Sequence, residues 1–275
     1  NREQDEAFIF ALLDRARALG FVLGTIDLIY GLPKQSSDSF AFTLQKVLEL
    51  RPDRLSVFNY AHMPELFAAQ RKIHRADLPD AAQKLAILQE TIHTLTTGGY
   101  QFIGMDHFAL PEDELAVAQR NGVLHRNFQG YTTCGDTDLL GMGVSAISMI
   151  GDSYAQNEKV LNQWHQRVAS QGNALWRGIS LSSDDCLRRD VIKALICQFT
   201  LNFSQTEQQW GIVFEDYFAE DLQLLAPFIE DGLVTLSQRE LRVPARGRLL
   251  IRNICMCFDR YLRTRVRQQQ YSRVI

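Results

Sequence analysis

Apolar and polar residues along the first hundred positions alternate between two periods, one typical of helices and one of strands. Helical spacing predicts helices at 3–19, from Ser36 or Ser37 onward, and at 80–97. Short apolar runs between them predict strands at 25–30, 54–60 and 101–105. Strand, helix, strand, helix, strand in this order predicts an α/β fold, with parallel strands joined by right-handed crossovers.

Polar residues interrupt these apolar strands or follow them directly. Alternation along 25–30 places Asp27 on the face opposite the larger apolar side chains, so we expect it to point into a barrel or cleft. The polar segments 59–62 and 106–107 follow the other two strands, at the edge where α/β enzymes bind ligands. Each of these polar features taken singly is more typical of structural hydrogen bonding. Three such features on successive strands favour a ligand-binding site.

A glycine-rich segment at 122–151 follows the three strands. Five of the seventeen glycines lie within 130–151, among aromatic, hydroxyl and acidic residues. Glycine at this density indicates backbone that turns tightly or lets another group approach closely. Composition alone is equally compatible with a turn between core strands and with part of a binding site.

The residues from 184 onward have a different pattern. Helices are predicted at 184–199 and 214–230, then a short hairpin with its turn at 237–240, then a last helix. Helices followed by a small hairpin are typical of a winged-helix arrangement. We therefore predict two domains, 1–183 and a mostly helical 184–275.

The charge is unevenly distributed. The whole chain carries a formal charge of −3, whereas 239–275 has ten arginines, no lysine and two acids, which gives that segment +8. Such a segment is suited to an anion, either in a partner or elsewhere on the protein, although a solvated helical face explains it equally well.

Several classes of protein are disfavoured by the sequence. No apolar run is long enough to span a membrane, and no signal peptide is present. The five cysteines are scattered, which indicates a reducing cytoplasm, and Cys255 and Cys257 have the wrong spacing for a zinc or redox pair. Phosphate-loop, zincin and nucleophile-elbow motifs are absent, and no residue is assigned to a metal.

Four segments together identify a family. They read GTIDLIYGLPKQ at 24–35, RLSVFNYAH at 54–62, FIGMDHFA at 102–109 and HRNFQGYTT at the start of 125–151, and DGLV and GRLLIRNICMCFD follow near the end. They closely resemble oxygen-independent coproporphyrinogen III oxidases, which are radical SAM enzymes of haem synthesis. Related haem chaperones typically carry an HNxxYW-type motif, whereas 125–131 lacks that tryptophan.

The resemblance implies a fold and cofactors. The fold is the C-terminal half of a radical SAM (β/α) barrel followed by the helical, winged-helix-like domain. The family binds a [4Fe-4S] cluster through a CxxxCxxC motif, together with two molecules of S-adenosyl-L-methionine (SAM). That motif is absent here, and the chain opens on a predicted helix at Asn1. We therefore expect about the first two-fifths of the enzyme to be missing, and the chain alone to be inactive.

The resemblance also assigns residues by position. Arg2, Asp27 and Ala61 match contacts to the second SAM, and Ile147 matches a contact to the first. Phe128 and Gln129 match residues that shape the active site. A guanidinium suits a SAM carboxylate, and a carboxylate such as that of Asp27 suits hydroxyl or amine donors.

The implied activity is the oxidative decarboxylation of two propionate side chains of coproporphyrinogen III to vinyl groups, which gives protoporphyrinogen IX. An unidentified electron donor and acceptor are implied as partners. No nucleic acid or membrane partner is expected, and the full-length protein is expected to be a monomer. Two alternatives remain at this point: a haem chaperone of the same superfamily, and a winged-helix nucleic-acid-binding module that uses the basic segment.

Overall fold

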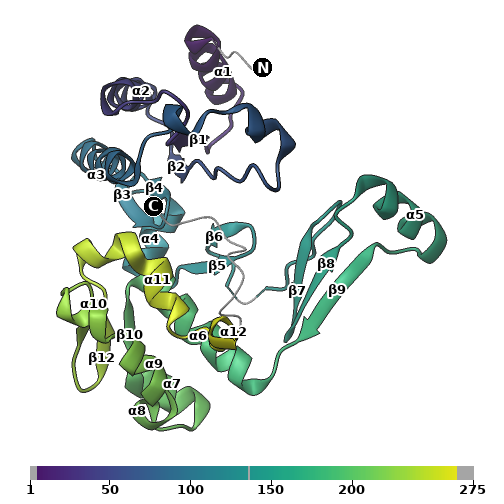
Figure 1. The fold of residues 1–275 in the computed structure, drawn as a ribbon, viewed down its shortest axis with the longest axis vertical. Helices are drawn as coiled ribbons and strands as arrows, with labels where there is room; N and C mark the ends of the chain where they lie inside the picture. The colour runs from purple at the N-terminus through teal and green to yellow at the C-terminus, as the bar shows by residue number, and fades with distance from the viewer. Residues whose placement is uncertain (1–4, 136, 265–275) are drawn as a thin grey trace. The chain divides into compact units, whose positions relative to one another are not determined.

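The computed structural model describes residues 5–135 and 137–264, and they form two compact units (Figure 1). The first unit takes in the described residues up to Val117, and the second takes in those from Ala118. This division differs from the predicted boundary between 183 and 184, which stays a prediction. The physical reason for the difference is that residues before 184 pack against the helix that begins at Ser183. The Tyr131 hydroxyl, for example, donates to the Ile196 carbonyl in that helix (3.0 Å).

The first unit contains the predicted alternation of helices and strands. Its elements are α1 (Glu6–Ala18), β1 (Thr25–Tyr30), α2 (Ser37–Leu50), β2 (Arg54–Asn59), the 3-10 turns η1 (Ala68–Lys72) and η2 (Arg75–Asp77), α3 (Ala81–Thr97), β3 (Gln101–Gly104), β4 (His107–Ala109) and α4 (Glu114–Arg120), which crosses into the second unit. Capping boxes at Ser36 and Asp80 fix where α2 and α3 begin, because each side chain accepts a backbone N–H three residues on.

The strand order in this sheet is β1-β2-β4-β3. The prediction of parallel pairing is confirmed for β1 and β2 but is wrong for β3, which pairs antiparallel with β4. Met105 adopts a left-handed φ of 52°, so the chain turns back directly after β3. The returning strand β4 takes the place beside β2, and the Val57 N–H donates to the Asp106 carbonyl (2.7 Å).

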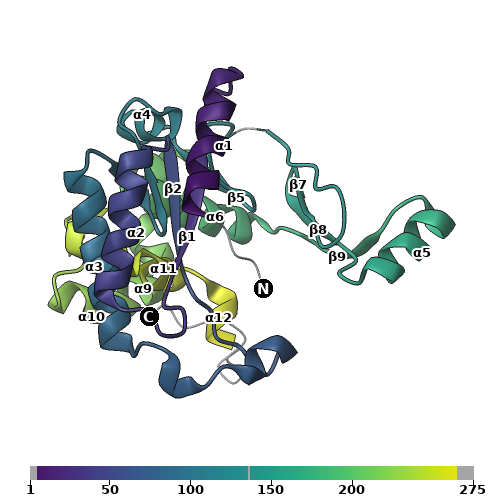
Figure 2. The same ribbon diagram turned by 90° about the horizontal axis from the view of Figure 1, so that it is seen from above.

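Helices α2 and α3 lie together on one side of the β1–β2 pair (Figure 2). The side chains beneath them are buried, with Leu55 and Val57 both at 0% exposure. Asp27 is exposed on the opposite face, as the alternation predicted, directly across from Ser56. His107 pairs with Ser56 from the other side, so Asp27, Ser56 and His107 share one row of that face, with Ser56 buried at 5% exposure.

The second unit combines two small sheets and a hairpin with short helices. Its elements are β5 (His125–Asn127), β6 (Gly130–Thr132), β7 (Ile147–Ile150), β8 (Ser153–Asn157), α5 (Leu161–Gln171), β9 (Leu175–Ser180), α6 (Ser183–Gln198), β10 (Thr200–Asn202), α7 (Phe203–Trp210), α8 (Phe214–Tyr217), α9 (Ala219–Leu224), α10 (Ala226–Glu230), β11 (Thr235–Leu236), β12 (Glu240–Arg242), η3 (Ala245–Leu250), α11 (Ile251–Met256) and α12 (Arg260–Thr264).

One expectation for this unit is corrected, and another is confirmed. The single helix predicted at 214–230 is three short helices, α8 to α10, and Pro227 lies at the start of the third, where its missing N–H costs no hydrogen bond. The predicted hairpin is present as β11 and β12, and the structure adds β10 on its other side. None of the described helices has both the length and the apolar character needed to cross a membrane.

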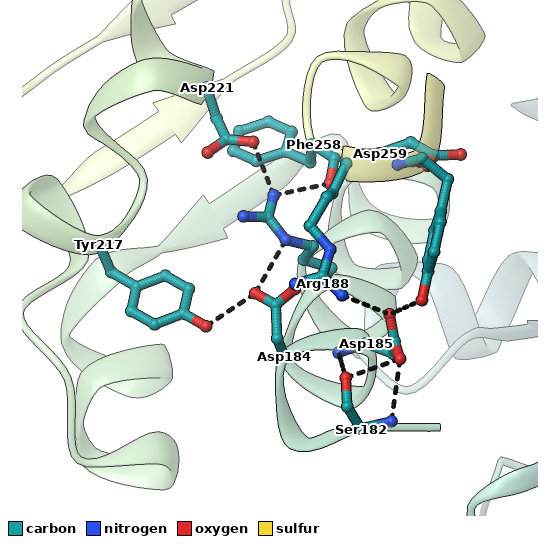
Figure 3. A network of polar contacts seen from close by, with 10 residues as sticks. Ser182, Asp184, Asp185, Arg188, Tyr217, Asp221, Phe258 and Asp259 are labelled. Atoms are coloured by element: carbon teal, nitrogen blue, oxygen red, sulfur yellow. Dashed lines mark hydrogen bonds and ion pairs between the residues drawn. The ribbon is translucent and has the colours of Figure 1, made fainter. Parts of the chain in front are cut away.

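An ion-pair network joins α6 to the helices that follow it (Figure 3). The Arg188 guanidinium donates to Asp221 (2.7 Å), to Asp184 (3.0 Å) and to the Phe258 carbonyl (3.0 Å). The side chains of Arg188 and Asp221 are 12% and 2% exposed. A charge this deeply buried must be paired, so the network fixes α9 and Phe258, which lies between α11 and α12, against α6.

Replacing Asp221 with alanine is expected to destabilise the protein strongly. The Asp221→Ala variant leaves the Arg188 charge buried with one carboxylate fewer, which costs about 3–5 kcal/mol. Denaturant unfolding of wild type and variant measures the loss. Arg260→Ala is the control, since it removes a half-exposed partner of the same network and is expected to shift the unfolding midpoint far less. Equal shifts in the two variants would contradict this account.

Candidate functional site

The hairpin of β5 and β6 presents Phe128 and Gln129 at its tip. Asn127 pairs with Gly130, so these two residues are the whole loop. The Gln129 N–H donates to the Asn127 side chain (2.8 Å), and Gly130 adopts a φ of +130°, which favours glycine. The side chain of Phe128 is therefore held out from the hairpin, 50% exposed.

The base of this hairpin is fixed to α6. The Tyr131 hydroxyl donates to the Ile196 carbonyl on α6, and within the hairpin the guanidinium of its cross-strand partner Arg126 lies 4.6 Å from the centre of the Tyr131 ring. Gly135 passes so close to the His125 ring that a Cβ there would lie 2.1 Å from it. The position of the tip is thus determined by packing at the opposite end of the hairpin.

A three-stranded antiparallel sheet, in the order β7-β8-β9, carries the second part of the site (Figure 1). Ile147 on β7 pairs with Gln156 on β8, which pairs with Arg177 on β9. Directly paired residues point to the same face of a sheet, so these three side chains form one row. The next row on that face is Met149, Tyr154 and Ile179.

The hairpin tip meets this face. The Phe128 ring contacts the Tyr154 ring edge to face, with centroids 5.1 Å apart and an interplanar angle of 89°. Burial raises the pKa of Tyr154, whereas the neighbouring Arg189 opposes that rise. The phenol therefore stays protonated near neutral pH. Phe128 and Ile147 consequently border the same surface of the sheet.

The glycine-rich segment lies along β7. Leu139 and Met149 exchange two backbone hydrogen bonds (2.8 Å each), and Asn157 donates to the Gly143 carbonyl (2.9 Å). A Cβ on Gly141 would lie 2.6 Å from the Ile147 carbonyl oxygen. The segment is therefore packed closely against the strand that carries Ile147, and its part in a binding site stays a prediction.

The remaining predicted residues belong to the first unit. Asp27 is exposed on β1, and Ala61 lies just beyond β2, where its carbonyl accepts from the Gln70 amide (3.0 Å). Both stay candidate ligand contacts. Arg2 lies outside the described residues. Sequence reasoning treated His107 as a strand end, whereas the structure places it in the row of Asp27.

The described cysteines do not fit an iron–sulfur cluster. Cys134 is exposed and the other four are buried, and burial raises the pKa of Cys197 to about 12. Cluster ligands are thiolates, which a thiol with a raised pKa disfavours. Among residues 5–135 and 137–264, no group of three or more His, Cys, Asp or Glu is placed to hold a metal ion.

Sequence reasoning missed Tyr154, Gln156 and Arg177. Their membership of the site depends on the pairing of β8 with both neighbours, and β9 lies almost thirty positions after β7. The alternation of side chains along each strand was available in the sequence. The partner and register of each strand were not, because they are set by contacts distant in the chain.

Known proteins match this chain over its whole length, and one family model matches part of it. Residues 181–250 match the HemN C-terminal domain family. The chain is 72% identical over its full length to the oxygen-independent coproporphyrinogen III oxidase of Salmonella typhimurium and 71% identical to that of Escherichia coli K12, and it spans 60% of each. It is 47% identical to the protein of that name from Thermostichus vulcanus, over 95% of the chain and 81% of the relative.

A solved structure is similar as well. It is described as "Coproporphyrinogen III oxidase (HemN) from Escherichia coli is a Radical SAM enzyme", with 72% identity and a TM-score of 0.93. The match covers 95% of this chain and 60% of that one. The chain thus spans about three fifths of the length of the first relatives that it matches.

Substituting Gly141 is expected to loosen β7. In Gly141→Ala the new methyl group meets the backbone of Ile147, and overpacking of this kind costs about 1–3 kcal/mol. Amide hydrogen exchange at Met149, whose N–H bonds to Leu139, should accelerate by about tenfold or more.

Gly143→Ala is the matched control for this substitution. No atom lies within 4 Å of its Cβ position, although its φ is +98°. It should strain the loop and leave exchange at Met149 much less affected. Unchanged exchange in Gly141→Ala would mean that the close approach does not hold β7 in place.

Proposed function

The chain belongs to the oxygen-independent coproporphyrinogen III oxidase family, and we propose that it forms the C-terminal part of such an enzyme. The proposed reaction converts two propionate side chains of coproporphyrinogen III to vinyl groups, which gives protoporphyrinogen IX. Each conversion removes a hydrogen atom from the propionate chain, then CO2 and one further electron. The observation that carries the proposal is the contact of Phe128 with the sheet face of Ile147.

Residues of this chain would bind and shield the reactants. Phe128 and Gln129 would shape the active site from the hairpin tip, and Ile147 would provide an apolar contact for one SAM molecule. Asp27 and Ala61 would contact a second SAM, and the exposed carboxylate of Asp27 suits hydroxyl or amine donors. SAM would supply the hydrogen-abstracting radical when bound with a [4Fe-4S] cluster, whose ligands we place outside this chain.

The proposal extends to the fold of the C-terminal residues, the oligomeric state and the partners. We infer a winged-helix-like arrangement for the residues from 184, since the β10-β12-β11 sheet follows α6 there. We further propose a monomeric, cytoplasmic full-length enzyme with separate electron donor and acceptor partners and without a nucleic-acid partner. The names of the relatives favour an oxidase over a haem chaperone or a nucleic-acid-binding module.

The role of Phe128 is testable in the full-length protein, which is this chain together with the remaining two fifths that its relatives carry. Phe128→Ala should lower kcat/KM for coproporphyrinogen III by about tenfold or more, because it opens the wall beside Tyr154. Anaerobic assays with SAM and a reductant measure this. Phe42→Ala, which removes an exposed ring on α2, should leave kcat/KM unchanged. Equal values for wild type and Phe128→Ala would contradict the assignment.

The proposal that the cluster ligands lie outside this chain has its own test. The chain alone, reconstituted anaerobically with iron and sulfide, should develop no absorption band of a [4Fe-4S] cluster, because its cysteines lack the CxxxCxxC spacing. The full-length protein treated identically should develop one. A clear band in the isolated chain would show that its own cysteines bind the cluster.

A further inference from the structure

The face of the β7-β8-β9 sheet that meets Phe128 carries one cation among its paired strand residues. Its two rows are Ile147, Gln156 and Arg177, and Met149, Tyr154 and Ile179. Five of these six side chains are uncharged near neutral pH, and Arg177 is exposed on the edge strand β9. Because neighbouring strands lie about 4.8 Å apart, the Arg177 backbone is about 10 Å from that of Ile147.

Arg177 is oriented by uncharged groups. Its Nε donates to the Gln156 side-chain carbonyl (3.0 Å), and its guanidinium lies 4.6 Å from the centre of the Trp176 ring. The Gln156 amide in turn donates to the Ser145 carbonyl (3.1 Å) in the glycine-rich segment. Within the part of the chain that the structure describes, no carboxylate lies within 4 Å of Arg177.

Two other arginines near this sheet are already paired. Arg167 on α5 lies 3.3 Å from the buried Glu158, and Arg189 on α6 lies 3.4 Å from Asp152. Arg177 therefore differs from them in having its guanidinium oriented and its charge unpaired. A planar guanidinium of this kind binds a carboxylate through two parallel hydrogen bonds.

We propose that Arg177 binds a propionate carboxylate of the porphyrinogen substrate at the rim of the site bordered by Phe128 and Ile147. This inference rests on the proposed function, which supplies a substrate with four carboxylates. The macrocycle would lie against the apolar side chains of the face, and the carboxylate would meet Arg177 at the edge strand. Arg177 would thereby determine specificity for carboxylated side chains and the orientation of the ring.

The test uses the full-length protein and coproporphyrin III, the oxidised and fluorescent form of the substrate, as a binding probe. Arg177→Ala should weaken binding of the probe by about tenfold or more, because a charge-assisted pair is lost. Arg177→Lys should recover part of the affinity. For the reaction itself, KM for coproporphyrinogen III should rise while kcat changes by less than about twofold, since binding rather than chemistry is affected.

Two controls separate a specific carboxylate contact from a general loss of positive charge. Lys159→Ala removes a cation that lies over the Trp176 ring (5.0 Å) and not in the two rows, and it should leave affinity unchanged. The tetramethyl ester of coproporphyrin III has no carboxylates. It should bind more weakly than the free acid, and its affinity should be the same for wild type and Arg177→Ala. Thermal unfolding confirms that each variant is folded.

The outcomes distinguish this inference from the proposed function. A wild-type protein that neither binds the porphyrin nor converts the porphyrinogen overturns the proposed function itself. An active wild type with unchanged affinity and KM in Arg177→Ala overturns the inference alone. Equal losses in Arg177→Ala and Lys159→Ala also overturn it, because they indicate general electrostatics.

Discussion

The candidate site depends on the pairing of β8 with two neighbours at once. Its backbone bonds to β7 on one side and to β9 on the other, and this double pairing determines which side chains share a face. Shifting either register by one residue would turn Ile147 or Arg177 to the opposite face. The surface that Phe128 contacts is therefore a consequence of backbone hydrogen bonding.

This sheet is held differently from the helices that follow it. Ser148, at 6% exposure, is the single buried residue of β7, β8 and β9, and all six residues of β9 are exposed. The α6 region, by contrast, combines fully buried aromatic rings such as Phe214 and Phe258 with the buried pair of Arg188 and Asp221. The unit thus has a densely packed part that fixes the base of the hairpin and a thinly packed sheet that carries the proposed binding face.

Charge is distributed in a way that suits an anionic ligand. Arg167 and Arg189 are neutralised by acids, Arg167 by Glu158 and Arg189 by Asp152. An arginine held only by an amide and an aromatic ring keeps its charge available and already has its guanidinium oriented. Such preorganisation reduces the entropy lost when a carboxylate binds.

The sequence by itself determined the local features of the protein. Helical and strand periods predicted the alternation of the first unit and placed Asp27 opposite the larger apolar side chains. The family resemblance at 125–131 assigned Phe128 and Gln129 to the active site, which stays a prediction. Only the tertiary structure decided that β4 inserts beside β2 after the left-handed turn at Met105, and that Arg177 reaches the face of Ile147. Side-chain periodicity is a property of neighbouring residues, whereas the choice of strand partner depends on contacts between segments far apart in the chain.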